Sequence, residues 1–315
     1  MGEPAGAAAG PAPDVSVVVV TYNAAADIER CLASVQAQAR ELIVVDHGSA
    51  DGTVALVRER FPQARVIEQG NLGFGAGMNA GLRVAAGAWV LLLNADAWAE
   101  GDDSGPAGAL ARLVEFGEAR PRAAVFGPRL RNTDGSLQRS VRGAPTLWRL
   151  ATEYLFLRKL GPRTQAFNAF YAGGFDHGSA RAVEWLMGAV LLVRRAAVDE
   201  VGLFDERYFL FSEETDWMER FRAAGWEVWF CPEAEFTHVG GASHGGRMYR
   251  ENVRGHLRFF ATHRGPRAAA RVRLLLLWSL RLRALAFPGA RGAMYREAAR
   301  WLASGGVQQL LDEPR

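Results

Sequence analysis

A short polar motif follows a very apolar stretch of the chain. Asn94-Ala95-Asp96 comes directly after Leu91-Leu92-Leu93, so a carboxylate stands where a buried strand is expected to end. Hard divalent cations prefer oxygen ligands, and such a cation can bridge the pyrophosphate of a bound nucleotide. Asn and Asp are also common in turns and helix caps, so the motif alone fits either a metal ligand or a plain turn.

Two adjacent glutamates lie among aromatic residues in the segment Phe209–Trp217. Neighbouring rings exclude water, which raises the pKa of a carboxyl group toward neutrality and suits it to general-base work. Acidic residues at the start of a helix also complement the helix dipole. We expect both roles to occur here, with Glu214 serving catalysis and Asp216 serving the fold.

Two loops have the composition of a nucleotide site. Asp46 opens a loop that runs to Thr53, and a carboxylate there can accept hydrogen bonds from a nucleobase or from ribose hydroxyls. The glycine-rich loop Asn71–Asn79 allows close backbone approach to a ligand. Within it, Gly75–Ala80 also fits the G-x-G-x-x-A fingerprint of dinucleotide-binding proteins, although two strand–helix units precede it. A nicotinamide-dependent oxidoreductase is therefore an alternative.

A single histidine, His238, follows a predicted strand and precedes Gly240-Gly241. A lone histidine is more often structural than a ligand, but glycines directly after it favour a loop that touches a ligand.

Strands and helices alternate over residues 15–96. Apolar runs predict strands over 15–20, 42–45, 66–67 and 89–93, with helical patterns between them. This alternation predicts an α/β fold with a doubly wound, mostly parallel sheet and helices on both faces. Polar residues follow the carboxyl ends of these strands, which is the edge where open α/β sheets bind ligands.

The chain divides into three parts. We interpret 1–13 as a disordered tail, 14–260 as the α/β domain and 261–315 as a basic helical extension. Cys31 and Cys231 lack metal-ligand spacing, so no zinc site is expected. No apolar run reaches about eighteen residues, so no membrane-spanning helix is expected either.

The extension combines arginines with an apolar stretch that contains Leu274–Leu277 and Trp278. Such a segment fits a helix at a membrane surface or a core helix with solvated arginines. Nucleic-acid binding is not expected, because the basic residues gather in this one tail and not along an aromatic stripe.

Together these segments resemble the family 2 inverting glycosyltransferases, which have the GT-A fold, and within them the bacterial rhamnosyltransferase-like members. The resemblance covers about residues 15–260. It is carried by the segments Val17–Asn23, Val44–Thr53, Asn71–Asn79, Leu91–Asp96, Trp185–Ala189, Phe204–Asp216 and His238–Ser243.

The resemblance implies a role for each matching position. Glu214 stands where the family usually has an aspartate base, and Asn94 stands where many members have aspartate. The implied nucleotide-sugar ligands are Thr21, Asn23, Asp46, Asn71, Gly73, Gly77, Asn79 and Asn94. The implied metal ligands are Asp96 and His238, the catalytic base is Glu214, and the acceptor-side residues are Trp185 and Glu213.

The implied activity is inverting transfer of a sugar from a nucleotide-diphosphate sugar, such as dTDP-rhamnose or a UDP-sugar, to a saccharide or lipid-linked acceptor. The implied setting is cell-surface polysaccharide synthesis, in the cytoplasm, with peripheral contact at the inner face of the cell membrane. The implied cofactor is Mg²⁺ or Mn²⁺. The alternatives are the NAD(P)-dependent oxidoreductase and a catalytically inactive nucleotide-sugar-binding protein.

Overall fold

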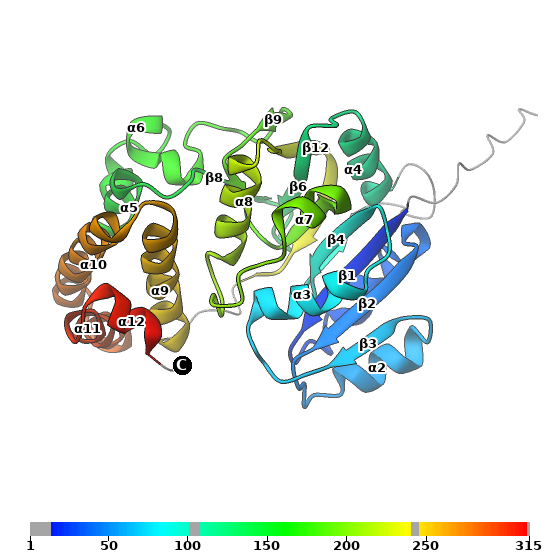
Figure 1. Ribbon diagram of the computed structural model, residues 1–315, viewed down its shortest axis with the longest axis horizontal. Helices are drawn as coiled ribbons and strands as arrows, with labels where there is room; N and C mark the ends of the chain where they lie inside the picture. The colour runs from blue at the N-terminus through cyan, green and yellow to red at the C-terminus, as the bar shows by residue number, and fades with distance from the viewer. Residues whose placement is uncertain (1–13, 101–107, 241–245, 314–315) are drawn as a thin grey trace, which may run out of the picture.

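A ten-stranded mixed sheet runs through the larger part of the protein, in a computed structural model that describes residues 14–100, 108–240 and 246–313 (Figure 1). The main strand order is β3-β2-β1-β4-β11-β6-β12-β5, and β7 and β9 pair at its margins. These strands are β1 (Val15–Thr21), β2 (Glu41–Asp46), β3 (Arg65–Glu68), β4 (Trp89–Asn94), β5 (Ala97–Ala99), β6 (Ala123–Arg131), β7 (Leu137–Gln138), β9 (Arg181–Ala182), β11 (Val190–Arg194) and β12 (Glu227–His238).

The first four strands of the main order are parallel, and β11 runs antiparallel between β4 and β6. The register places Thr21 beside Asp46 and Val20 beside Asn94. Three polar strand ends therefore meet at one edge of the sheet. The predicted α/β fold with a mostly parallel sheet is confirmed.

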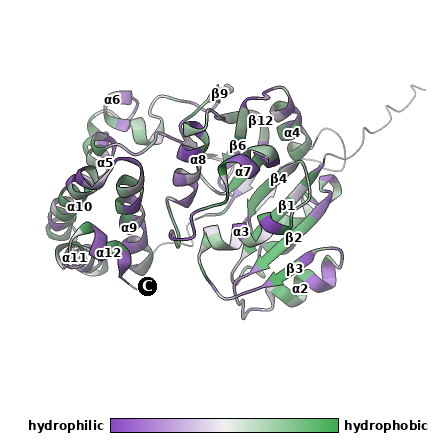
Figure 2. Ribbon diagram, in the orientation of Figure 1, coloured by the Kyte–Doolittle hydropathy of each residue, from purple (hydrophilic) through white to green (hydrophobic). Residues whose placement is uncertain are grey.

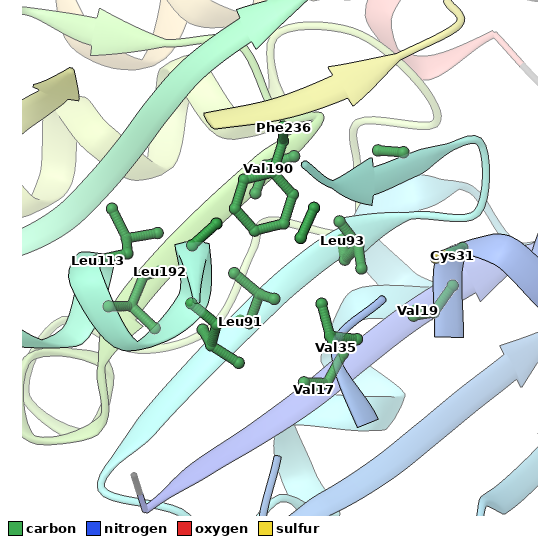
Figure 3. Close-up of a cluster of buried hydrophobic side chains, with 14 of the residues drawn as sticks. Val17, Val19, Cys31, Val35, Leu91, Leu93, Leu113, Val190, Leu192 and Phe236 are labelled. Atoms are coloured by element: carbon green, nitrogen blue, oxygen red, sulfur yellow. The ribbon is translucent and has the colours of Figure 1, made fainter. Parts of the chain in front are cut away.

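Alternate residues of the central strands face opposite layers of helices. Val17 and Val19 point into one apolar cluster, with α1, α2 and α4 (Figure 3), whereas Val18 points into the other, with α3, α7 and α8. Burying each such side chain contributes about 1.5–3 kcal/mol, so both faces must be covered. These helices are α1 (Ile28–Ala33), α2 (Thr53–Arg60), α3 (Phe74–Val84), α4 (Ala109–Glu118), α7 (Arg195–Val201) and α8 (Glu213–Ala223).

A separate helical unit lies beside α8 and has its own apolar core (Figure 1). Its helices are α5 (Leu147–Tyr154), α9 (Gly246–His263), α10 (Pro266–Ala286), α11 (Gly289–Ala303) and α12 (Val307–Asp312). Short helices η2 (Leu157–Leu160), α6 (Gln165–Asn168) and η3 (Ala169–Tyr171) follow α5, and η1 (Gln36–Gln38) follows α1. Figure 2 shows hydrophobic and hydrophilic residues alternating along α9 and α10, as one-sided packing requires.

The helical extension was expected over residues 261–315. Residues upstream of 261 also contribute to the core of the helical unit. Val253 and Leu257 of α9 pack into its core, and so does Leu150 of α5, which lies more than 90 residues upstream of α9. α10 is a core helix on one face only, because Leu276 and Leu280 are buried there. The tail expected over 1–13 lies outside the described residues.

α8 is tied to the helical unit by a polar network. Asp216 accepts hydrogen bonds from Arg220 Nε on its own helix (2.9 Å) and from His263 Nε2 at the end of α9 (2.7 Å). Arg264 forms an ion pair with Glu219. This network supports the expected structural role of Asp216, next to the residues considered below.

Candidate active site

Asp96 and His238 face each other at the carboxyl edge of the sheet. Asp96 lies in the turn between β4 and β5, and His238 ends β12, which pairs with β5. Asp96 Oδ1 is 3.3 Å from His238 Nε2, and Oδ2 accepts a hydrogen bond from the Gly240 amide at 3.1 Å. Burial opposes ionisation of Asp96, but the contacts with His238 and Gly240 outweigh it, so its pKa is lowered. The carboxylate is charged at neutral pH and 26% exposed, so a ligand can reach it.

Neither protonation state of His238 Nε2 satisfies both of its neighbours. Besides the Asp96 carboxylate, Nε2 has the Asn94 Nδ2 donor at 3.3 Å. A proton on Nε2 suits Asp96 and opposes Asn94, and a lone pair does the reverse. Asn94 Oδ1 is also buried without a partner among the described residues. Oxygen and imidazole groups that converge in this way fit a divalent cation.

The described residues contain no group of three or more His, Cys, Asp or Glu side chains that could hold a metal ion. Asp96 and His238 are only two protein ligands. A cation at this edge would therefore need further ligands, and the phosphate oxygens of a bound nucleotide are the usual source of them.

The expected nucleoside residues lie at the ends of the next two strands along the edge, β1 and β2. Thr21 is buried, and its hydroxyl has no partner among the described residues. Asn23 has a left-handed backbone (φ 51°), and its side-chain oxygen accepts from the Ala50 amide. Asp46 is 1% exposed and accepts from the amides of Gly48 and Ser49 at 2.9 Å. Asp46 thus holds the loop together, and direct contact with a nucleoside would require the loop to open.

The glycine-rich loop packs where side chains would not fit. A Cβ atom at Gly73 would lie 2.5 Å from the carbonyl oxygen of Phe209, and one at Gly77 would lie 2.6 Å from His47 Nε2. The Asn71 side chain accepts from the Gly73 amide at 3.2 Å. These two glycines therefore bring the start of α3 against the loop before α8 and against the Asp46 loop.

Asn79 is placed differently from its implied role. It is buried, its amide nitrogen donates to Phe204 O and Glu206 Oε1, and its oxygen accepts from the Phe204 amide. The side chain is fully used in joining α3 to the loop before α8, so it does not face the nucleotide edge as a free group.

Glu213 and Glu214 occupy the first turn of α8 and point apart. Glu213 packs against Gly75 of the glycine-rich loop, and Glu214 packs against Gly188, with closest approaches of 3.6 Å to a Cβ placed at either glycine. One oxygen of each carboxyl group is buried without a partner among the described residues. The preceding residue, Ser212, has a left-handed backbone (φ 71°), a strained conformation that is common at functional sites.

Both carboxyl groups bind protons more tightly than usual. Burial, reinforced by the charge of Glu214, raises the pKa of Glu213 well above its ordinary value. Burial also raises the pKa of Glu214, to about 7, against the opposing effects of nearby backbone amides and of the Arg142 charge. A carboxyl group that ionises near neutral pH is well matched to general-base catalysis.

Glu214 and the Asp96 edge are linked through the two residues that precede β11. The Asn94 amide donates to Ala189 O at 2.9 Å, and the neighbouring Gly188 packs against Glu214. Trp185, at the start of β10 (Trp185–Leu186), pairs with β8 (Val141–Arg142) and lines a cavity together with Glu214. Its indole N–H donates to Gly143 O.

Sequence reasoning missed Gln138, which orients His238. Gln138 Nε2 donates to Asn132 Oδ1 (2.8 Å) and to His238 O (3.1 Å), so Gln138 Oε1 must accept from His238 Nδ1 (2.8 Å). It also missed Arg142, whose charge acts on Glu214. No sequence signal marks these residues, because their contacts span 100 and 72 positions of the chain.

The fold and this edge define the class of protein. A mixed sheet with a carboxylate after β4, a second acidic site on α8 and a glycine-rich loop between them is the arrangement of a GT-A glycosyltransferase. Residues 16–184 match the family described as glycosyl transferase family 2. The chain belongs to this glycosyltransferase family. Membership of the chain in this family gives no support to the oxidoreductase alternative. The segment Gly75–Ala80 also lies in the third strand–helix unit, whereas the dinucleotide-binding fingerprint belongs to the first.

Relatives and solved structures agree with this assignment. The chain is 36% identical over 238 residues to an N-acetylglucosaminyl-diphospho-decaprenol L-rhamnosyltransferase of Mycobacterium tuberculosis (strain CDC 1551 / Oshkosh), covering 70% of this chain and 75% of the relative. The mannosyltransferase PcManGT of Pyrobaculum calidifontis, in complex with GDP-Man and Mn²⁺, matches with a TM-score of 0.53 and 18% identity over 98% of this chain and 89% of that one. GalNAc-T7 with UDP, GalNAc and Mn²⁺ matches with a TM-score of 0.57 and 15% identity over 96% and 56%. These two structures show the fold.

Proposed function

We propose that this glycosyltransferase moves L-rhamnose from dTDP-rhamnose to the N-acetylglucosamine of a diphospho-lipid, with inversion, in cell-surface polysaccharide synthesis. The observation that carries the proposal is the convergence of Asp96 and His238 at the sheet edge, next to Glu214. The named activity of the mycobacterial relative supports this donor sugar and acceptor.

Asp96 and His238 are the residues proposed to hold a divalent cation, with Asn94 beside them. Bound there, Mg²⁺ or Mn²⁺ would supply positive charge to the leaving diphosphate. Thr21, Asn23 and the Asp46 loop would receive the nucleoside. Asn71, Gly73 and Gly77 would shape the loop that covers the donor, and Asn79 would fix that loop from behind.

Glu214 is proposed as the general base. It would accept the proton of the acceptor hydroxyl while the hydroxyl oxygen bonds to the anomeric carbon, and the bond to the diphosphate would break with its electron pair on the diphosphate oxygen. A single in-line displacement of this kind inverts the anomeric configuration. Trp185 lies on the acceptor side in this proposal, whereas Glu213, which the family resemblance also assigns to that side, packs against Gly75 of the glycine-rich loop.

A lipid-linked acceptor places the enzyme at a membrane surface. No helix in the described part of the chain is long and apolar enough to cross a membrane. The outer face of α10 exposes Leu274, Trp278, Leu282 and Leu285, with exposed Arg281 beside them. We infer that this outer face rests on the anionic inner face of the cell membrane, because exposed apolar groups beside arginines suit an interfacial helix.

A donor panel tests the proposal. The full-length protein is incubated with dTDP-rhamnose, UDP-glucose or GDP-mannose, with Mg²⁺ or Mn²⁺, and with N-acetylglucosaminyl-diphospho-farnesol as acceptor. We expect release of dTDP that requires the metal and is much faster with the acceptor than without it, with an α-linked rhamnoside product if the donor is β-linked. Transfer from another donor would correct the sugar and keep the class of reaction. Absence of nucleoside diphosphate release with every donor would overturn the proposed function.

A further inference from the structure

A cavity of about 220 Å³ separates α8 from the helical unit. One side is formed by Glu214 of α8 and by Trp185 of β10, and the other side is formed by residues of α5, α9 and α10. The cavity therefore has the proposed base in one wall and residues of the helical unit in the other.

The lining combines aromatic rings with polar groups, some of which have no partner among the described residues. Tyr171 and Trp185 present rings, and Tyr249 and Asn252 of α9 present polar groups. His256, also on α9, is 7% exposed, and its Nδ1 has no partner among the described residues. Leaving a buried polar group without a partner is unfavourable, and a ligand with hydroxyl groups can supply the missing hydrogen bond.

The environment of His256 keeps its ring neutral. Burial lowers the pKa of His256 to about 4, and Tyr154 packs edge-on against it with ring centres 5.8 Å apart. A neutral imidazole carries one donor and one acceptor nitrogen. A hydroxyl group can pair with either one, whereas an anionic group would find no charge on this ring.

We propose that this cavity binds the sugar ring of the acceptor and that His256 determines acceptor specificity by hydrogen bonding to one of its hydroxyl groups. The inference rests on the proposed function. Aromatic faces suit the apolar face of a sugar ring, and the unpartnered polar groups suit its hydroxyls. With the ring in the cavity, one hydroxyl faces Glu214, which accepts its proton as described above. The helical unit thereby selects the acceptor, while the sheet domain binds the donor.

The position of His256 relative to Glu214 is fixed by its neighbour in the chain. A Cβ atom at Gly255 would lie 2.8 Å from both Phe211 O and Ser212 Oγ, so α9 sits directly against the residues that precede α8. The Asp216–His263 contact holds the far end of the same helix. The two walls of the cavity therefore form one rigid arrangement, as specific binding requires.

The test compares His256→Phe with His256→Asn in the full-length protein. Phenylalanine keeps a ring for Tyr154 and removes both nitrogens, whereas asparagine keeps a polar group near the position of Nδ1. With N-acetylglucosaminyl-diphospho-farnesol, we expect His256→Phe to raise the acceptor KM about tenfold or more, and His256→Asn to recover part of this loss. The control is His177→Asn, a buried histidine outside the cavity, which should leave the acceptor KM unchanged.

Two further measurements keep the outcomes distinct. Calorimetric binding of dTDP and slow hydrolysis of dTDP-rhamnose without acceptor should be unchanged in His256→Phe, which shows that the variant is folded. If His256→Phe does not fold, Tyr171→Ala tests another lining residue of the cavity by the same acceptor KM. An unchanged KM in a folded variant, with an active wild type, overturns this inference and leaves the proposed function standing. Failure of the wild type with every donor overturns the proposed function itself.

Discussion

The side-chain amide of Gln138 determines which nitrogen of His238 faces Asp96. Gln138 Nε2 donates to two acceptors, Asn132 Oδ1 and His238 O. These two hydrogen bonds fix the orientation of the Gln138 amide. Gln138 Oε1 therefore accepts a hydrogen bond from His238 Nδ1, and the other ring nitrogen, Nε2, faces Asp96. Metal-binding histidines commonly donate their other ring N–H to such a group, which orients the ring and raises its basicity.

Replacing Gln138 should weaken metal binding without touching a proposed ligand. We expect Gln138→Leu to lower the apparent Mn²⁺ affinity by about 10–100-fold, the range found when such supporting contacts are removed. The measurement is a Mn²⁺ titration of transfer rate at saturating donor. Gln63→Leu, at an exposed glutamine, is the matched control. Equal Mn²⁺ dependence in the two variants would show that Gln138 has only a structural role.

Asp96→Asn should abolish transfer and metal-dependent donor binding while leaving the fold intact. The substitution keeps the size of the side chain and removes the charge that the lowered pKa maintains at neutral pH. Calorimetry of dTDP with and without Mn²⁺ separates the two contributions, and thermal unfolding reports the fold. Turnover like that of the wild type would remove the metal from the mechanism.

The sequence predicted the strand ends well because their signals are local. The apolar runs before Asp46 and Asn94 are buried strands, and parallel pairing brings their ends to one edge without further information. Adjacent positions on a helix point about 100° apart, so the different directions of Glu213 and Glu214 also follow from local geometry. Family resemblance supplied the proposed roles of these residues.

The contacts that complete the site depend on tertiary structure. Gln138 lies on β7, a two-residue strand, and His256 lies on a helix that no motif connects with Glu214. Val253 and Leu257 of α9 pack into the core of the helical unit, and no local pattern in the sequence assigns them to it. Their partners on α5 are distant in the chain, and only packing identifies them.

The outer face of α10 should bind anionic vesicles. We expect the full-length protein to float with vesicles of about 30% phosphatidylglycerol, and the double variant Trp278→Glu/Leu285→Glu to lose this binding, because both side chains are exposed and leave the core unchanged. Leu72→Glu, at an equally exposed leucine in the glycine-rich loop, is the control. Truncation before α10 is unsuitable, because Leu276 and Leu280 belong to the core. Identical flotation of the double variant and the wild type would contradict this surface assignment.

The raised pKa of Glu214 should appear in both activity and stability. We expect kcat/KM to rise with pH up to about 7 and then to level off, because only the ionised carboxylate accepts a proton. Glu214→Gln should reduce turnover by about 100-fold or more with unchanged donor affinity. Glu213→Gln should be milder, because this residue faces Gly75 and not the cavity.

Through the ionisation of Glu214, a rise in pH should lower the stability of the folded protein, whereas it should raise turnover. The native protein holds the Glu214 proton more tightly than the unfolded chain, whose carboxyl group has its ordinary pKa of 4.5. This advantage of the native state is complete below about pH 4.5 and is lost as the pH rises to about 7. Glu214→Gln removes the titration, so its melting temperature should exceed that of the wild type at pH 8 and approach it at pH 5.

If Glu213→Gln is inactive and Glu214→Gln is active, the base is Glu213. If both remain active, the base lies outside this segment.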